Sequence, residues 1–373
     1  MAQNANLPQD HRALVVTSTS EVPAIQNLPT PKPTPGSAIA RILATNVLSY
    51  SRDIYNGKRQ YPFPTPLVPG SSAVGRIAAV GPDAALLKPG DLVLIDCYIR
   101  GRDDPTATFL SGISQGLSEG SKKLMAGEWR NSTYAEYAKV PMESCTILDE
   151  KRFCTDRSHG GLGYSIEELA SISTPMVPYG GLKDIDLQAG ESVVIAPATG
   201  NFGHAAIRVA LAMGAKVIAM GRNQTMLDKL TQLNPARVTT VPITGNMEAD
   251  AHSLKSHGPI DVYFDISPPV AAQSTHLKSC ILAIRHSGRI SLMGGIRADV
   301  GFPYQWIMRN NITLKGKWMY ERSDITSLVK MVEVGLFDLA RGEEVKAFGL
   351  DDWERAFTAA AEESIGHSVV LSP

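Results

Sequence analysis

The stretch VVIAPATGNFGHAAIRVALAMGAKVIAMGRN, residues 193–223, decides the fold of the second half of this chain. A β-branched run leads into Ala198, Gly200 and Gly203, and a helix-forming segment follows at once. This is the spacing of a dinucleotide-binding turn, with Ala198 in place of the first glycine. Gly200 lets the backbone approach a pyrophosphate, and Gly203 lets helix and strand pack closely. The N-terminus of the helix offers the phosphates unpaired N–H groups and partial positive charge. A tight turn without a ligand is the alternative, and the second strand, KVIAM, favours the ligand.

The residues after KVIAM separate two nicotinamide coenzymes. Proteins that bind NAD usually place an Asp or Glu there, on the ribose 2′-hydroxyl. Here Gly221, Arg222 and Asn223 follow, and none is a carboxylate. Arg222 can form a planar fork on a 2′-phosphate, although an arginine solvated at the end of a strand would look the same in sequence. The sequence predicts NADPH as the cofactor.

Two later segments, FDISPP (264–269) and LMGG (292–295), resemble further strand ends. Ligands of doubly wound sheets lie outside the carboxyl ends of the strands, so these residues are expected near the ribose and nicotinamide. The predicted cofactor-binding residues are Ala198, Thr199, Gly200, Asn201, Phe202, Gly203, Gly221, Arg222, Asn223, Asp265, Ser267, Gly294 and Gly295.

The two halves of the chain differ in pattern. From about residue 180, apolar strand runs alternate with helical stretches, which predicts a parallel sheet covered on both faces. Residues 12–95 are rich in Pro, Gly and short β-branched runs, which predicts a β-rich, barrel-like domain. Residues 98–132 are polar and Gly-rich, and are expected to form a long surface loop or excursion. The fold class is therefore α/β, with a β-barrel domain beside a doubly wound parallel sheet.

Length and composition limit the possible functions. A chain of 373 residues favours two domains. With 36 basic and 37 acidic residues, the net charge of -1 gives no electrostatic reason to expect nucleic acid or an anionic membrane as a partner. The four cysteines form no C-x-x-C pair, and the N-terminal segment has no apolar core of a signal peptide. A cytoplasmic protein with reduced thiols is expected.

The order of barrel, dinucleotide turn and return segment resembles the medium-chain dehydrogenase/reductase family. The resemblance covers nearly the whole chain. It is carried by DIYNGKRQYPFPTPLVPGSSAVGRIAAVG (53–81), LKPGDLVLI (87–95), STYAEYAKVP (132–141) and the turn at Ala198–Gly203. It implies a GroES-like catalytic domain over 1–178, completed by 321–373, and a Rossmann domain over 179–320. The overall character is similar to the zinc-free, fungal alcohol dehydrogenase-like or quinone oxidoreductase-like members.

Metal-dependent members of this family carry a Cys three residues before an Asp, and a Gly-His-Glu downstream. Matching that pattern puts Tyr50 at the Cys position, because Asp53 follows by three, and puts Ser71 and Ser72 at the His and Glu positions. Zinc prefers thiolate, imidazole or carboxylate ligands, and hydroxyls are poor substitutes. The family's structural zinc would need four closely spaced cysteines, and the region of the excursion in this chain has only Cys97. No metal is predicted at either site.

The loss of a Lewis acid changes which reaction is favoured. Hydride delivery to a simple ketone produces a localised alkoxide, which zinc normally stabilises. Delivery to a conjugated C=C bond or a quinone spreads charge onto a distant oxygen, which a few hydrogen-bond donors can stabilise. The sequence predicts an NADPH-dependent reductase of an apolar enone, enoyl compound or quinone, with Tyr50 and Tyr61 as candidate catalytic donors. Tyr61 matches a loop position where enoyl reductases of the family carry a tyrosine.

Three other functions stay open from sequence alone. They are reduction of a carbonyl compound, a trans-acting enoyl reductase that serves a polyketide synthase, with residues 98–132 as a docking or lid element, and a protein that binds NADPH without turnover. The segment NITLKGKWMY (311–320) resembles the last strand of the family's cofactor domain, which in many members pairs across a two-fold axis. An exposed edge strand favours such pairing, so a homodimer is expected.

Overall fold

The computed structural model describes residues 7–362 and 365–373, which form two compact units. The first unit runs to Ser173 and takes in the chain again from Glu343, whereas the second spans Thr174–Gly342 and residues 365–366. The family resemblance instead predicts boundaries at 178/179 and 320/321. The segment 321–342 therefore lies with the second unit, where Lys183 forms an ion pair with Asp324 at 2.8 Å.

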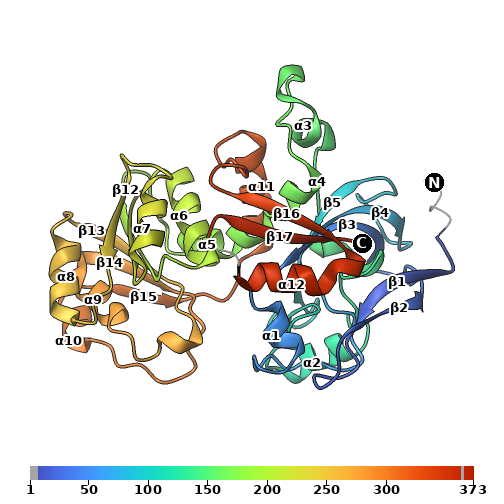
Figure 1. Ribbon diagram of the computed structural model, residues 1–373, viewed down its shortest axis with the longest axis horizontal. Helices are drawn as coiled ribbons and strands as arrows, with labels where there is room; N and C mark the ends of the chain where they lie inside the picture. The colour runs from blue at the N-terminus through green and yellow to red at the C-terminus, as the bar shows by residue number, and fades with distance from the viewer. Residues whose placement is uncertain (1–6, 363–364) are drawn as a thin grey trace. The chain divides into compact units, whose positions relative to one another are not determined.

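The second unit is built on a six-stranded parallel sheet with the order β12-β11-β10-β13-β14-β15. Its strands are β10 (Ser192–Ala196), β11 (Lys216–Gly221), β12 (Val238–Pro242), β13 (Ile260–Asp265), β14 (Ile284–Leu292) and β15 (Thr313–Gly316). Its helices are α5 (Ser173–Asp184), α6 (Asn201–Ala212), α7 (Gln224–Thr231), α8 (Met247–Lys255), α9 (His276–Ala283), α10 (Tyr304–Arg309) and α11 (Arg322–Glu333). Figure 1 shows α6 and α7 on one side of this sheet and α8 and α9 on the other. The strand order reverses between β10 and β13, and ligands of doubly wound sheets bind at such a switch point.

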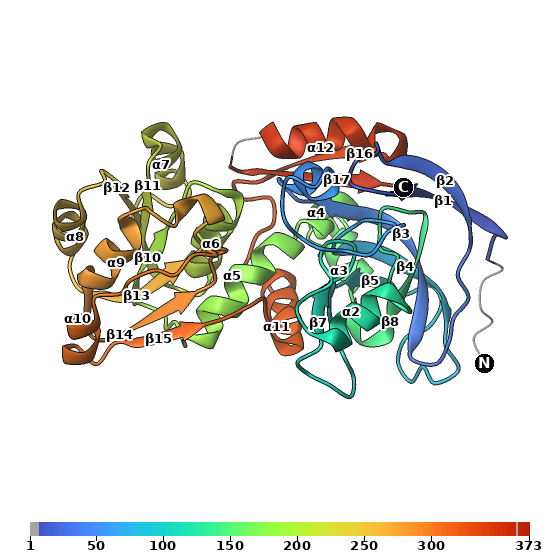
Figure 2. The same cartoon turned by 90° about the horizontal axis from the view of Figure 1, so that it is seen from below.

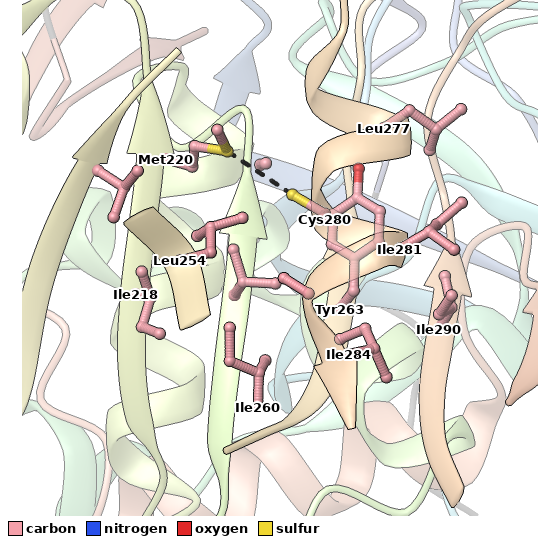
Figure 3. Packing of buried hydrophobic residues seen from close by; sticks show 14 of the residues in the cluster. Ile218, Met220, Leu254, Ile260, Tyr263, Leu277, Cys280, Ile281, Ile284 and Ile290 are labelled. Carbon is pink, nitrogen blue, oxygen red and sulfur yellow. Dashed lines mark hydrogen bonds between the residues drawn. The ribbon is translucent and has the colours of Figure 1, made fainter. Parts of the chain in front are cut away.

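Alternation along the strands of the second unit explains how its core forms. Val194 and Ala196 of β10 belong to one buried cluster with Leu254 of α8 and Cys280 of α9, so they point to the face that these helices cover. Figure 3 shows Tyr263, Cys280 and Ile290 of this cluster. Because successive strand residues point to opposite faces, the β10 residues that alternate with Val194 and Ala196 face α6 and α7. Strands buried on both sides read as continuous apolar runs, which is the pattern seen in the sequence.

The first unit contains a mainly antiparallel sheet with the order β16-β17-β3-β4-β5-β9, and β8 also pairs with β3. Its strands are β1 (Asp10–Val15), β2 (Ala24–Pro29), β3 (Ser37–Val47), β4 (Ala73–Val80), β5 (Leu92–Ile95), β6 (Tyr98–Arg100), β7 (Thr108–Leu110), β8 (Tyr137–Pro141), β9 (Cys145–Ile147), β16 (Glu344–Gly349) and β17 (His367–Ser372). Its helices are α1 (Ser51–Tyr55), α2 (Glu119–Ala126), α3 (Glu150–Cys154), α4 (Ile166–Ala170) and α12 (Trp353–Glu362). The C-terminal elements α12 and β17 pack on each other in this unit (Figure 2). No helix of the described residues has the length and apolar character needed to cross a membrane.

The prediction of a surface loop over residues 98–132 is wrong in its local structure. This segment forms the β6–β7 hairpin and helix α2, and it has a small core of its own. Phe109, Met125 and Trp129 are buried there together with Leu67. A polar average composition concealed these few well-spaced apolar residues.

Candidate active site

The turn between β10 and α6 has the local structure expected of a phosphate-binding site. Ala198 is fully buried, and its N–H donates to the carbonyl of Met220 on the neighbouring strand at 2.7 Å. Gly200 is the N-cap of α6, with φ -110° and ψ 168°, and it offers no capping side chain. The first N–H groups of a helix have no partner within the helix, so a ligand must satisfy them or water does. With the partial positive charge of the helix N-terminus, this turn favours an anion.

The two glycines of the turn differ in what surrounds them. A Cβ on Gly203 would lie 2.6 Å from the carbonyl oxygen of Ala198 and 2.7 Å from that of Pro197, so only glycine lets the helix approach the turn this closely. A Cβ on Gly200 would meet nothing within 4 Å. The space beside Gly200 is therefore open to a ligand, and the residues present fit a dinucleotide pyrophosphate.

The carboxyl end of β11 lies against the same turn. A Cβ on Gly221 would be 2.6 Å from Cγ2 of Thr199. Arg222 is exposed, and it has no ion pair or hydrogen bond from its side chain within residues 7–362 and 365–373. The structure gives Asn223 a role that the sequence did not suggest, because its side chain caps α7 by accepting from the N–H of Met226 at 3.1 Å.

The carboxyl ends of β13 and β14 bring the other predicted cofactor residues together. The N–H of Met293 donates to the carbonyl of Asp265 at 3.0 Å, and the N–H of Gly295 donates to the carbonyl of Ser267 at 2.7 Å. A Cβ on Gly294 would lie 2.5 Å from Oδ2 of Asp265. The backbone at Gly294 therefore packs directly on the Asp265 carboxylate, as two adjacent parallel strands require.

A buried polar network fixes this end of the sheet, and sequence reasoning missed most of it. Asp265 Oδ1 accepts from Ser267 Oγ at 2.5 Å and from Tyr263 Oη at 3.1 Å. Because the Ser267 proton goes to Asp265, His276 Nε2, 2.8 Å from Ser267 Oγ, must be the donor of that pair. The other ring nitrogen lies 2.7 Å from Ser274 Oγ. The network orients the Asp265 carboxylate, and burial raises the pKa of Tyr263 well above its usual value, with Asp265 adding to the shift.

Tyr50 and Tyr61, the candidate donors, lie side by side in the first unit. Tyr50 is the residue that precedes α1, and its half-buried ring meets the ring of Tyr61 edge to face, with centroids 6.1 Å apart. Burial is the main cause that raises the pKa of Tyr50, the Tyr61 phenol adds to the shift, and the guanidinium of Arg59 opposes it. The Tyr50 phenol therefore stays protonated at neutral pH and can donate a hydrogen bond.

Ser71 and Ser72, which match the positions of two metal ligands, are buried and already bonded to backbone groups. Ser71 Oγ donates to the carbonyl of Asn46 at 2.5 Å, and Ser72 Oγ accepts from the N–H of Cys97 at 3.1 Å. Burial raises the pKa of Cys97 to about 12, so its thiol is not poised to ionise. This donor set does not fit zinc. Elsewhere in the described chain, no three His, Cys, Asp or Glu side chains converge in a way that would hold a metal ion.

The structure thus brings the predicted residues together as two local groups. The nucleotide residues gather at the carboxyl ends of β10, β11, β13 and β14 in the second unit, and the two tyrosines gather beside α1 in the first. Sequence reasoning missed Arg59, which lies between the tyrosines, and His276. The segment KRQY holds Arg59 two residues before Tyr61, but only the return of the chain after α1 places its side chain on Tyr50.

Two family models match different parts of the chain. The family model described as "Alcohol dehydrogenase GroES-like domain" matches residues 34–150, and the one described as "Zinc-binding dehydrogenase" matches residues 202–333, a range that contains none of Tyr50, Ser71 and Ser72. An L-threonine 3-dehydrogenase of Saccharopolyspora erythraea is 25% identical over 82% of this chain and 83% of its own length. An acryloyl-coenzyme A reductase of Metallosphaera sedula is 29% identical over 56% of this chain and 58% of its own length.

Solved structures show the same fold. An alcohol dehydrogenase from Escherichia coli CFT073 in complex with its cofactor NADH superposes with a TM-score of 0.76 at 14% identity, covering 98% of this chain and 100% of that one. The GroES-like and dehydrogenase matches fall on the two units in the order that the resemblance implied. The chain therefore belongs to the medium-chain dehydrogenase/reductase superfamily, whose members are oxidoreductases that use a nicotinamide cofactor.

Proposed function

We propose that this chain is a zinc-independent, NADPH-dependent reductase that transfers hydride to an activated C=C bond of an enone or enoyl compound, or to a quinone. One observation carries the proposal. The hydroxyls of Ser71 and Ser72 are bonded to backbone groups, and the third position holds the protonated phenol of Tyr50. A site without a Lewis acid suits a reaction whose negative charge is delocalised.

The roles of the residues follow from their positions. The N-terminus of α6 would hold the pyrophosphate, and Arg222 would pair with the 2′-phosphate. The bound coenzyme would supply the hydride. Tyr50 and Tyr61 would donate hydrogen bonds to the substrate oxygen that becomes negative.

We also propose the cytoplasm as the location, since all four cysteines are free thiols, three of them, Cys97, Cys145 and Cys154, in the first unit.

Spectrophotometry of NADPH oxidation against a panel of quinones, enones and simple aldehydes tests this function. We expect turnover of the conjugated compounds and little turnover of the aldehydes. The reverse preference would favour the second candidate, an alcohol dehydrogenase or carbonyl reductase, which the relatives named as threonine and alcohol dehydrogenases support. The relative named as an acryloyl-coenzyme A reductase supports C=C reduction. Tight NADPH binding without oxidation of any compound would favour a non-catalytic binding protein.

Substitution of Tyr50 by phenylalanine removes one proposed donor without removing the ring. We expect kcat for an enone to fall about 100-fold, the loss typical of one missing hydrogen-bond donor to a developing oxyanion. The KM for NADPH should stay unchanged, because Tyr50 lies in the GroES-like unit. Steady-state kinetics of Y50F measures both, and an unchanged kcat would discard the role of Tyr50.

We also propose a homodimer formed through β15. All four residues of this strand are exposed, and β15 lies at one edge of the six-stranded sheet with Leu314 36% exposed. An edge strand presents unpaired N–H and C=O groups that another copy can pair with. Size-exclusion chromatography with light scattering should give twice the mass of one chain, and a mass of one chain at micromolar concentration would remove the proposal.

A further inference from the structure

The guanidinium of Arg59 lies in an aromatic corner made by the two candidate catalytic tyrosines. Its central carbon lies 3.8 Å from the ring centroid of Tyr50 and 4.8 Å from that of Tyr61. Arg59 Nη2 donates to Tyr61 Oη at 3.1 Å, which leaves the hydroxyl proton of Tyr61 available to a further acceptor. The backbone holds the residue in place, because the N–H of Arg59 donates to the carbonyl of Asp53 at 2.6 Å.

Among the described residues, the positive charge of Arg59 has no carboxylate partner. Other arginines of this unit are paired, Arg76 with Glu150 and Arg102 with Glu143. Within residues 7–362 and 365–373, Arg59 forms no ion pair, and its Nε is buried without a hydrogen-bond acceptor. A half-buried guanidinium that lies over the Tyr50 ring and donates to the Tyr61 hydroxyl favours a planar oxyanion, because its fork of N–H donors matches the geometry of such a group.

We infer that Arg59 is the electrophilic group of this site and that its guanidinium contacts the substrate oxygen. This inference rests on the proposed function and extends it. The hydride would leave a C–H bond of the reduced coenzyme with both bonding electrons, which oxidises the coenzyme. As the hydride forms a new C–H bond at the β-carbon of an enone, the C=C electron pair shifts toward the carbonyl and the carbonyl π pair moves onto oxygen as an enolate. Arg59 holds that enolate oxygen. A proton from a tyrosine hydroxyl or from water then forms the C–H bond at the α-carbon, and solvent returns the proton to the tyrosine.

A purely structural cation–π contact is the alternative, and binding of 4-nitrophenol separates the two. Its phenolate is a planar oxyanion like an enolate, its absorbance reports ionisation, and it needs no turnover. We expect the wild-type protein to bind the phenolate in preference to the neutral phenol. Arg59→Met should lose at least about 10-fold of the phenolate affinity and keep that of the neutral phenol. Arg52→Met removes an exposed arginine of α1 with the same change of charge, and should match wild type.

Kinetics supply the second readout. Arg59→Met should lower kcat for an enone about 100-fold and leave the KM for NADPH unchanged. If Arg59→Met melts well below wild type, Arg59→Gln makes the same comparison, because it keeps an N–H donor toward Tyr61 without the charge. The inference is overturned if wild type, Arg59→Met and Arg52→Met bind the phenolate equally. It is also overturned if Arg52→Met loses as much phenolate affinity as Arg59→Met.

The two proposals fail in different ways. If wild type oxidises NADPH with no enone or quinone, the proposed function fails, yet a phenolate preference that disappears in Arg59→Met still supports an oxyanion site at Arg59. If wild type reduces enones and Arg59→Met does so equally well, the function stands and the role of Arg59 is excluded.

Discussion

Substitution of Gly200 by aspartate should raise the dissociation constant for NADPH at least about 100-fold while the thermal unfolding midpoint of the free protein stays the same or rises. Gly200 has an extended backbone conformation that any residue can adopt, and a Cβ there would meet nothing within 4 Å. Aspartate is also a preferred N-cap, and its negative charge is favourable at the N-terminus of a helix. The fold should therefore accept the change. The carboxylate would occupy the space expected for the pyrophosphate and repel it.

Two companion variants separate the causes. Gly200→Asn adds nearly the same volume and also caps helices, so it should weaken binding less than Gly200→Asp if charge repulsion contributes. Gly203→Ala should destabilise the fold, unlike the substitutions at Gly200, because its Cβ would lie 2.6 Å from a backbone oxygen that cannot move easily. We expect it to lose about 1–3 kcal/mol in the free energy of unfolding, as overpacked sites do. Calorimetric titration with NADPH and urea denaturation measure the two effects. Normal NADPH binding by Gly200→Asp would show that the turn is not the phosphate site.

The local structure around these two glycines, and the parallel sheet that contains it, were predictable from the sequence. The spacing of Ala198, Gly200 and Gly203 is dictated by backbone geometry within a few residues, so it predicted the strand, the turn and the helix correctly. The same holds for the alternation of strands and helices that predicted the parallel sheet. Both the glycine spacing and the strand–helix alternation can be recognised in short stretches of sequence, without knowledge of contacts between distant residues.

Features that depend on contacts distant in sequence were not predicted. Phe109, Met125 and Trp129 are separated by polar residues, and they form a core only because a hairpin folds back on α2. His276 reaches Ser267 through the loop that leads to α9. The direction of a side chain was not predictable either, because the sequence does not show whether Arg59 points to solvent or to the two tyrosines.

The side chain of Arg222 should likewise decide between the two coenzymes. Substitution by glutamine is expected to raise the dissociation constant for NADPH about 10- to 100-fold and to leave that for NADH nearly unchanged. A hydrogen bond to a charged group contributes about 1.5–3 kcal/mol, and a tenfold change in affinity corresponds to about 1.4 kcal/mol. Arg222 is exposed and has no competing partner among the described residues, so it can turn toward a 2′-phosphate at little cost. Because the pair would form near the surface, NADPH affinity should also fall as salt concentration rises.

Lys229→Gln is the matched control, because it removes one exposed positive charge from the neighbouring helix α7 without touching the end of β11. It should leave both dissociation constants as in wild type. Arg222→Asp places a carboxylate after the second strand, where proteins that bind NAD usually carry one, and should reverse the preference toward NADH. Titration of each variant with both coenzymes gives the ratio directly. A wild-type protein that binds NADH more tightly, or an Arg222→Gln variant that weakens both coenzymes equally, would exclude a 2′-phosphate contact, and the open space beside Gly200 would then hold the pyrophosphate of NADH.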